Sequence, residues 1–389
     1  MAEFKEYTLG SICSRLSSGK GIPASQVSDS GLYPVYGGNG LRGYTDHSNF
    51  VGECAIIGRQ GAFCGNARYF SGEAYMTEHA VVTCANEHHN TRYLAYLLST
   101  MNLGRLSGQS AQPGLSVKTL SMQPVKLPSK ETQDQIVSVL AVIDDKIAVN
   151  ESINENLQAQ AQAIFKAWFI DTPDSLSWSS GTFSDIIDTM IAGDWGKDSP
   201  TGNNTEMVYC IRGADIPDVK NGNKGKMPTR FILPKNYVAK HLVAGDVVVE
   251  ISGGSPTQST GRIASISQSL LDRYDKGMVC TNFCKALKPK AGYSMFVYYY
   301  WQYLYDKNIF FSYENGTTGI KNLDISGFIE TEPIVLPPIE LIAKFDAFCH
   351  SVFDVIFANG LQNEQLANMR DTLLPKLMTG ELDVSELEL

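Results

Sequence analysis

The amino-acid sequence predicts an α+β fold in which two related domains in tandem are joined by two long helices that pair as an antiparallel coiled coil. Its 389 residues exceed the usual size of one hydrophobic core, which favours two globular units. The middle of the chain also matches its end at one fixed offset. Both matching segments carry apolar residues at heptad spacing, which is typical of helices that pair along a seam.

The internal repeat sets the expected domain boundaries. Pro124 falls on Pro333, a shift of 209 residues, and further identities follow in the same register without a gap. Upstream, a turn leads into a β-branched run in both copies, at residues 52–57 and 244–249. The predicted order is a first domain at 1–130, a first spacer helix at 131–171, a second domain at 172–337 and a second helix at 338–389.

The charge pattern separates the domains from the helices. The formal net charge of −9 argues against contact with phosphates if it is taken as a total. However, residues 1–127 carry +2 and residues 172–336 carry −1, whereas residues 128–171 carry −4 and residues 337–389 carry −6. Near-neutral domains and acidic helices suit a protein whose domains contact DNA and whose helices contact protein.

Each predicted helix presents a seam with asparagines near its middle. A first helix from about Gln133 to Phe169 would be on the order of 55 Å long at 1.5 Å per residue and would hold two domains at a fixed separation. Asparagines that face each other in a seam fix its register. The alternative is a plain helical linker whose asparagines are hydrated. The residues expected to pair the helices are Ile136, Leu140, Ile143, Ile147, Asn150, Asn154 and Leu157 in the first, and Val352, Ile356, Asn359, Asn363 and Leu366 in the second.

Motifs of independent catalysis are missing from the sequence. There is no GxxxxGK[ST] phosphate loop, and neither the histidines nor the cysteines show the paired spacing of a zinc site, so no metal is expected. Residues 336–339, Leu-Pro-Pro-Ile, lack the amide and the ring that hold a flipped base. The aromatic run Tyr298–Trp301 fits a packed helix face. Without an apolar stretch of about 18 residues or a secretory signal, the chain is expected in the cytoplasm and not in a membrane.

Several segments resemble one known family. They are residues 131–136 (Glu-Thr-Gln-Asp-Gln-Ile), 143–147 (Ile-Asp-Asp-Lys-Ile), 165–169 (Phe-Lys-Ala-Trp-Phe), 33–40 (Tyr-Pro-Val-Tyr-Gly-Gly-Asn-Gly) and 57–61 (Ile-Gly-Arg-Gln-Gly). Together they resemble the specificity subunits of type I restriction-modification systems over nearly the whole chain. The second copy departs from this pattern, because Ile339-Glu340-Leu341-Ile342 stands where the first has Glu131 to Gln135.

The resemblance implies a division of labour. Two target recognition domains would each read one half of a split, asymmetric site in double-stranded DNA, and the two helices would bind two methyltransferase (modification) subunits. Those partners would hold S-adenosylmethionine, and a separate restriction subunit would use ATP, so this chain would bind neither cofactor and perform no catalysis. Two alternatives stay open: a self-contained DNA methyltransferase or nuclease, and a protein scaffold that ignores DNA.

Reading DNA requires base-edge donors and acceptors on loops, with cations on the phosphates. In the first domain, cations and amides flank glycine-rich turns, and a polar loop precedes the first helix. In the second, a glycine-containing loop at residues 212–230 carries a local excess of cations, and another loop matches the polar one. The predicted DNA-binding residues are Arg42, Arg59, Gln60, Arg68, Gln109, Ser110, Gln112, Arg212, Lys220, Lys224, Lys226, Arg230, Arg262, Thr317, Thr318 and Lys321.

Overall fold

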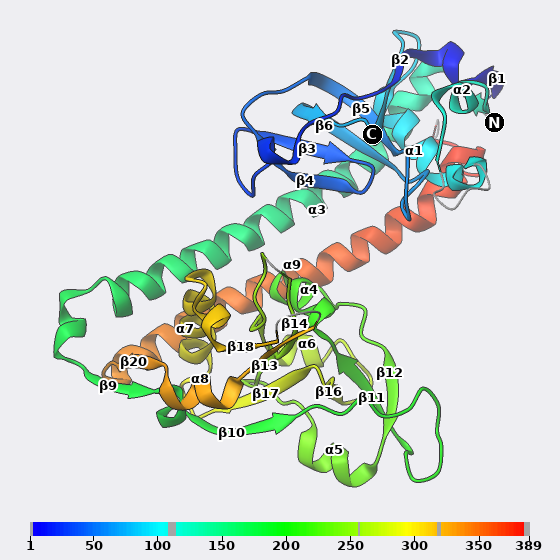
Figure 1. Ribbon diagram of the computed structural model, residues 1–389. Coiled ribbons are helices and arrows are strands. Elements are labelled where there is room, and N and C mark those ends of the chain that lie inside the picture. The colour runs from blue at the N-terminus through cyan, green and yellow to red at the C-terminus, as the bar shows by residue number, and fades with distance from the viewer. Residues whose placement is uncertain (1–2, 108–113, 256, 317–319, 385–389) are drawn as a thin grey trace. The chain divides into compact units, whose positions relative to one another are not determined.

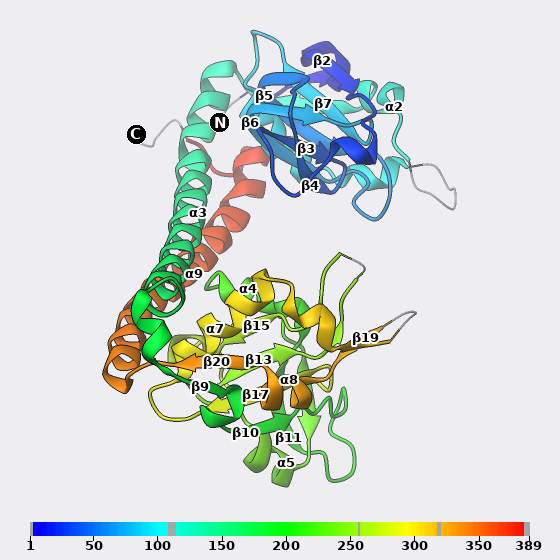
Figure 2. The same ribbon diagram turned by 60° about the vertical axis from the view of Figure 1, so that its left-hand side comes forward.

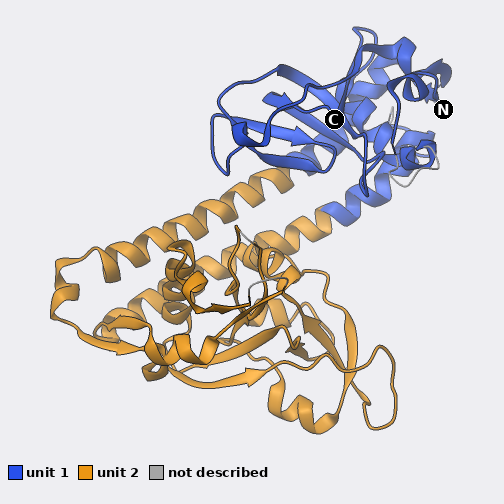
Figure 3. Ribbon diagram, viewed as in Figure 1, with its two compact units in different colours: residues 1–145, 367–389 blue, residues 146–366 orange. Residues whose placement is uncertain are grey.

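The structure is a computed structural model that describes residues 3–107, 114–255, 257–316 and 320–384 (Figure 1). The chain divides into two compact units (Figure 3). Unit 1 consists of Met1–Asp145 and Ala367–Leu389, and unit 2 of Lys146–Leu366. Each unit combines helices with β-sheet, so the mixed fold class expected from the sequence is confirmed.

Unit 1 is built on a six-stranded sheet in the order β2-β7-β5-β6-β3-β4, in which only the β3–β6 pair is parallel. A separate pair, β1 with β8, brings the start of the unit beside the strand that leads into the long helix. Helix α1 packs against β5 and β6 (Figure 1). The elements are β1 Lys5–Thr8, β2 Cys13–Ser18, β3 Tyr33–Gly37, β4 Gly40–Thr45, β5 Phe50–Gly58, β6 Ala67–Met76, β7 Ala80–Ala85, α1 Thr91–Thr100, α2 Val117–Ser121 and β8 Pro124–Leu127.

Unit 2 repeats these pairings in two sheets, β10-β17-β13-β15 and β12-β11-β16, with β11 and β16 parallel. Helix α7 packs against β15 and β17 (Figure 2). The elements are β9 Ser179–Thr182, β10 Ile187–Ala192, β11 Glu206–Ile211, α4 Ile216–Lys220, β12 Thr229–Ile232, α5 Pro234–Lys240, β13 Val247–Glu250, β14 Ser252–Gly253, β15 Ile263–Ser265, α6 Gln268–Leu271, β16 Met278–Cys280, β17 Cys284–Pro289, α7 Ser294–Asp306, β18 Glu314–Asn315, β19 Lys321–Leu323, α8 Ile325–Thr331 and β20 Pro333–Leu336.

The similarity between the units extends to backbone detail. In each, the helix that packs on the sheet is followed by an asparagine in the left-handed conformation, Asn102 with φ of 45° and Asn308 with φ of 60°. These are the two residues other than glycine with positive φ in the described part of the chain. Asparagine tolerates this conformation better than most residues. Each unit therefore turns from its helix into a 3-10 segment in the same way.

Two long helices, α3 (Lys130–Phe165) and α9 (Ile339–Thr379), contribute to both units. A π-helical segment, Lys166–Ile170, follows α3 and completes the segment expected to be helical. In unit 2, Asn150 Nδ2 donates to Asn363 Oδ1 at 2.8 Å, and Asn359 Nδ2 donates to Asn154 Oδ1 at 2.8 Å. Residue numbers rise along one helix as they fall along the other, so these helix segments run antiparallel within unit 2.

In unit 1, the other ends of α3 and α9 also contact each other. Arg370 Nη1 donates to Asp144 Oδ1 at 2.9 Å, and Ile136, Leu140 and Leu377 belong to one buried cluster. Of the residues expected to pair the helices, the buried ones are Ile136, Leu140, Ile143, Asn150, Asn154, Val352, Ile356 and Asn363, and the half-buried ones are Ile147, Leu157, Asn359 and Leu366.

The core of unit 2 is aromatic where its sheet meets the long helices. Phe165 and Phe169 lie with ring centroids 5.8 and 5.0 Å from Phe296, and Phe169 lies 5.3 Å from Phe345. The run Tyr298–Trp301 is buried on α7, so its interpretation as a packed helix face is confirmed. None of the helices in the described ranges has the length and apolar character needed to cross a membrane.

Candidate nucleic-acid interface

In unit 1, glycines of the β3–β4 hairpin make room for two predicted DNA-binding arginines. A Cβ added at Gly40, whose φ is +107°, would overlap Nη1 of Arg68, and one added at Gly37 would lie 2.7 Å from Cδ of Arg42. Arg68 Nη1 donates to the backbone oxygen of Asn39 at 3.4 Å, and Arg42 is exposed. Close approach of a backbone to another group is a common reason for glycine. The hairpin thus holds the guanidinium group of Arg68 and the aliphatic stem of Arg42 against its turn.

Arg59 and Gln60 follow the end of β5, beside the segment that resumes after the undescribed residues 108–113. The backbone N–H of Leu115 donates to the oxygen of Arg59 at 2.9 Å, and Gln60 forms an isolated bridge with Gly114. The predicted site residues Gln109, Ser110 and Gln112 lie outside the described residues. Arg59 also donates from Nε to the oxygen of Leu115 at 3.4 Å.

A three-residue turn, Thr77-Glu78-His79, links β6 to β7 beside these arginines. The turn is fixed at both ends, because Thr77 N donates to the oxygen of Tyr36 at 2.9 Å and Ala80 N donates to the oxygen of Thr77 at 3.0 Å. Arg59 N donates to the oxygen of His79 at 2.9 Å. His79 Nε2 lies 3.1 Å from Glu78 Oε1, and both side chains are 42% exposed.

Unit 2 has the same turn on the same backbone frame. Thr281-Asn282-Phe283 occupies the place of Thr77-Glu78-His79, and four backbone hydrogen bonds hold it in the corresponding way. They are Thr281 N to Ile211 O at 3.0 Å, Cys284 N to Thr281 O at 2.9 Å, Ile251 N to Phe283 O at 2.9 Å and Leu323 N to Ile251 O at 2.8 Å. A glycine lies against the turn in each unit, Gly19 in unit 1 and Gly193 in unit 2. A Cβ on either glycine would overlap the backbone oxygens of the threonine of the turn and of the residue before it.

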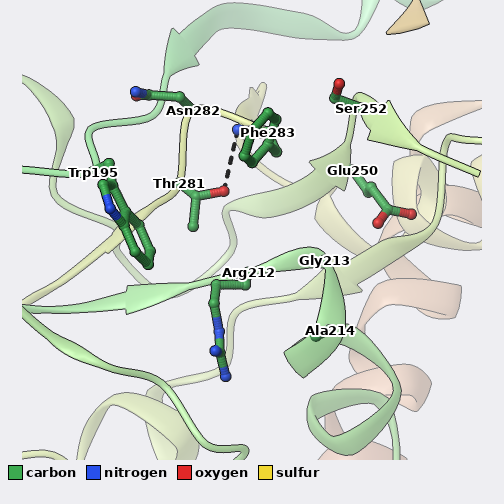
Figure 4. A pocket seen from close by; sticks show the side chains of 9 residues that line it. All are labelled: Trp195, Arg212, Gly213, Ala214, Glu250, Ser252, Thr281, Asn282 and Phe283. Atoms are coloured by element: carbon green, nitrogen blue, oxygen red, sulfur yellow. Dashed lines mark hydrogen bonds between the residues drawn. The ribbon is translucent and has the colours of Figure 1, made fainter. Parts of the chain in front are cut away.

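The turn of unit 2 borders a pocket of about 450 Å³ (Figure 4). Figure 4 shows Trp195 on one side, Phe283 on the other and Arg212 with Gly213 below them. Asn282 and Phe283 are exposed, the latter by 58%. Glu250 is buried at the far wall. Two aromatic side chains therefore wall the pocket, with Asn282 at its edge and Arg212 extending away below it.

Four of the cations that sequence reasoning assigned to DNA in unit 2 have acidic partners within the unit. Arg262 makes two hydrogen bonds of 2.7 Å to the buried carboxylate of Glu250. A buried carboxylate is costly unless it is paired, so such a cation stabilises the fold whatever else it contacts. The other pairs are Arg212 with Asp215, Arg230 with Asp198, and Lys321 with Glu314.

Asp215 illustrates the electrostatics of these pairs. Burial by itself would raise the pKa of its carboxyl group, but hydrogen bonds from Arg212 and from the backbone N–H of Lys226 outweigh it, and the pKa is lowered. The same contact raises the pKa of Arg212. Arg212 Nη2 also donates to the oxygen of Lys226 at 2.7 Å, so the pair fixes the loop that carries Lys224 and Lys226.

The remaining predicted residues of unit 2 differ in their surroundings. Lys220 donates to Gln302 at 2.7 Å, and burial lowers the pKa of its ammonium group. Lys224 lies with its Nζ 4.7 Å from the centre of the Tyr274 ring, and Lys226 is exposed. Thr317 and Thr318 lie outside the described residues. Among the described residues, no group of three or more histidine, cysteine or acidic side chains is arranged to hold a metal ion.

Comparison with known proteins places this geometry in a family. Residues 1–159 match the type I restriction modification DNA specificity domain. The type I restriction enzyme EcoprrI specificity subunit of Escherichia coli is 38% identical over 157 residues, which are 39% of this chain and 38% of that protein. The type I restriction enzyme MjaIX specificity subunit of Methanocaldococcus jannaschii is 30% identical over 319 residues, 76% of this chain and 70% of that protein.

The chain belongs to the type I restriction-modification specificity subunits. The crystal structure of the type I restriction-modification system S subunit from M. genitalium has a similar fold, with a TM-score of 0.58 at 17% identity over 97% of this chain and 96% of that one. The family resemblance and the function it implied, that of a specificity subunit, are therefore confirmed.

Sequence reasoning about this specificity subunit did not select Trp195, Glu78, His79, Asn282 or Phe283. None of them belongs to a motif, and the turn lies off the register of the repeat, because Thr77 corresponds to Thr281 at a shift of 204 residues and not 209. The two turns share only their threonine, because Ala80-Val81-Val82 follows the first and Cys284-Lys285-Ala286 follows the second, so no sequence pattern links them.

Proposed function

We propose that this specificity subunit reads a bipartite, asymmetric site in double-stranded DNA, one half with each unit. It would direct modification subunits and, through the complex, restriction subunits to that site, and would act in the cytoplasm. The chain would perform no bond chemistry itself. S-adenosylmethionine would bind the modification partners and ATP the restriction partner.

One observation carries this proposal. The two units hold different side chains on one backbone frame, with glycine-lined turns and cations around it in unit 1 and an aromatic pocket edged by the amide of Asn282 in unit 2. A shared frame gives both units the same way of approaching DNA, and different side chains give them different base-edge partners. Two sibling target recognition domains with unrelated half-sites are the function that this combination supports best.

The helices support a second part of the proposal, that α3 and α9 form an antiparallel coiled coil which sets the gap between the half-sites. The buried Asn150–Asn363 hydrogen bond and the half-buried Asn154–Asn359 hydrogen bond favour one register. Polar pairs of this kind in a helix seam are best known as devices that specify register.

The helix surfaces also support protein partners. On the part of α3 that belongs to unit 2, Val149 and Ile153 lie one helical turn apart and are 52% and 40% exposed. Neighbouring exposed apolar side chains on one helix face are more typical of a surface that binds a partner than of one that stays in contact with solvent. We assign this face of α3 to a modification subunit.

The proposal is tested by mapping methylated bases in a methylation-deficient host that receives this gene with those of its modification partners. The expected result is a two-part motif whose halves differ in sequence. An unsplit motif would contradict two reading units. Methylation by the purified chain with S-adenosylmethionine alone would favour a self-contained methyltransferase instead, and an assembled complex without sequence-selective DNA retention would favour a scaffold.

A further inference from the structure

The three-residue turn that both units share is placed to act as a reading element. Its backbone is fixed by the neighbouring strand β3 or β11, by the first residue of the strand that follows the turn, and by the residue that follows β5 or β13. The first residue is a buried threonine in both units, whereas the second and third are Glu78-His79 in one and Asn282-Phe283 in the other. A rigid frame that carries variable, accessible side chains is what direct readout of base edges requires.

In unit 2 the turn offers its side chains to an incoming ligand. The amide of Asn282 is exposed and makes no hydrogen bond within the described chain. Phe283 is 58% exposed and contributes one wall of the pocket that Trp195 completes (Figure 4). An amide and an aromatic ring on adjacent residues match an A·T pair, because asparagine bonds N6 and N7 of adenine and an apolar group contacts the methyl of thymine.

In unit 1 the turn offers a different chemistry at the corresponding place. The Glu78 carboxylate is an acceptor whose Oε2 is buried without a partner among the described residues and whose Oε1 lies 3.1 Å from His79 Nε2, and the imidazole of His79, which is 42% exposed, can donate. Arg42 adjoins the turn, since the Cβ position of Gly37 lies 2.7 Å from Cδ of Arg42 and 3.6 Å from Oγ1 of Thr77. An acceptor next to a donor matches a G·C pair, whose cytosine N4 donates and whose guanine O6 and N7 accept.

We propose that the second and third residues of this turn determine specificity in both units, with Asn282 and Phe283 reading an A·T pair in one half-site and Glu78 and His79 reading a G·C pair in the other. This inference rests on the proposed function, because it assumes two DNA-reading units. It adds residues that no motif in the sequence indicated.

The test uses the whole complex in the methylation-deficient host, with the methylated motif mapped for wild type, N282A/F283A and E78A/H79A. Each double variant is expected to lose roughly 5- to 150-fold discrimination at one base pair of one half-site and to leave the other half unchanged. Two matched controls are expected to keep the wild-type motif. E87A/H88A removes the exposed neighbouring pair Glu87-His88, and Q268A removes the exposed amide of Gln268 on α6.

Different mapping results would contradict the role of the turn and the proposed function. A two-part wild-type motif that both double variants retain at every position would overturn the role of the turn and leave the proposed function standing. An unsplit wild-type motif would overturn the proposed function and this inference with it. If a variant abolishes methylation, its purified complex is used to select from a pool of randomised duplexes. Preference lost at one pair of one half supports the inference, and preference lost throughout both halves overturns it.

Discussion

At the scale of single residues, the buried asparagines show how polar groups can specify a helix pair. Asn154 is fully engaged: its Nδ2 donates to the oxygens of Ile356 at 3.1 Å and Asn221 at 3.0 Å, while its Oδ1 accepts from Asn359. Asn150 is different, because its Oδ1 is buried and has no partner among the described residues. We therefore expect Asn154 to contribute more than Asn150 to the stability of the helix pair.

Replacing Asn154 by alanine should leave the half-buried amide of Asn359 without its acceptor, and the buried backbone oxygen of Ile356 without its side-chain donor. We expect N154A to lower the free energy of unfolding by about 2 kcal/mol, since an unsatisfied buried group costs on the order of 1–3 kcal/mol. N156A is the matched control, because Asn156 is exposed on the same helix. Urea unfolding followed by circular dichroism measures the free energy of unfolding of both variants. Equal losses in N154A and N156A would show that the hydrogen bonds of Asn154 add no stability beyond those of an exposed asparagine.

Arginines that look alike in the sequence should respond differently to mutation. Arg230 is 5% exposed, pairs with Asp198 and lies with its guanidinium 4.1 Å from the centre of the Trp195 ring, whereas Arg42 is exposed. R230A is expected to lower the melting temperature because it removes a buried contact. R42A should leave melting unchanged and reduce the slope of log K against log salt for DNA binding by about 1.

Melting curves and DNA titrations at several salt concentrations separate these two effects. Equal losses of stability in R42A and R230A would contradict the assignment of Arg230 to the fold. An unchanged salt slope in R42A would remove that residue from the DNA-binding set.

At the scale of elements, the contact between a long helix and the start of the helix on the sheet is made in both units, but by different residues. In unit 1, the start of α1 is held by Gln133, whose Oε1 accepts from Asn90 N at 3.0 Å. The repeat places Ile342 at the position of Gln133, and Ile342 is buried. In unit 2, Asp346 of α9 accepts from Met295 N at 3.1 Å at the start of α7 instead. The departure noticed in the sequence is thus compensated one turn further along the helix.

A close contact between Gly222 and α9 is a second feature at this scale. A Cβ added at Gly360 would overlap the oxygen of Gly222, which also accepts from Arg273 Nη1 at 2.7 Å. Glycine to alanine normally stabilises a helix interior by about 1 kcal/mol. Here the added methyl must displace backbone, so G360A should destabilise unit 2 by on the order of 1–3 kcal/mol.

Thermal unfolding of G360A and of the control S351A tests whether the glycine-to-alanine change lowers stability here instead of raising it. Ser351 is exposed on the same helix, so its replacement should change stability by less than about 0.5 kcal/mol. A stabilised G360A would show that the loop around Gly222 moves away at little cost.

At the scale of the whole molecule, the proposed coiled coil leads to a prediction about the DNA motif. Seven residues inserted before Asn150 in α3, together with seven after Asn363 in α9, keep both asparagine pairs in register. Seven helical residues add roughly 10 Å, and DNA rises about 3.4 Å per base pair, so the gap between half-sites should grow by about three base pairs. Methylation mapping measures the gap.

The half-sites themselves should stay the same in that variant. An insertion of equal length after Gly202, in an exposed turn of unit 2, is the control and should leave the gap as it was. New half-site bases with an unchanged gap would show that the helices do not set the spacing of the motif.

The sequence by itself determined the family and the mixed fold class, it predicted two copies of one plan from an internal repeat, and it indicated the asparagines that bond across α3 and α9 in unit 2. Heptads and repeats are linear patterns, so they are readable without a fold. Only the tertiary structure decided that Arg230 and Arg262 hold acidic partners, and that Thr77-Glu78-His79 and Thr281-Asn282-Phe283 are counterparts. These relations depend on strands that pair across loops of different length, and such pairings leave no fixed spacing in the chain.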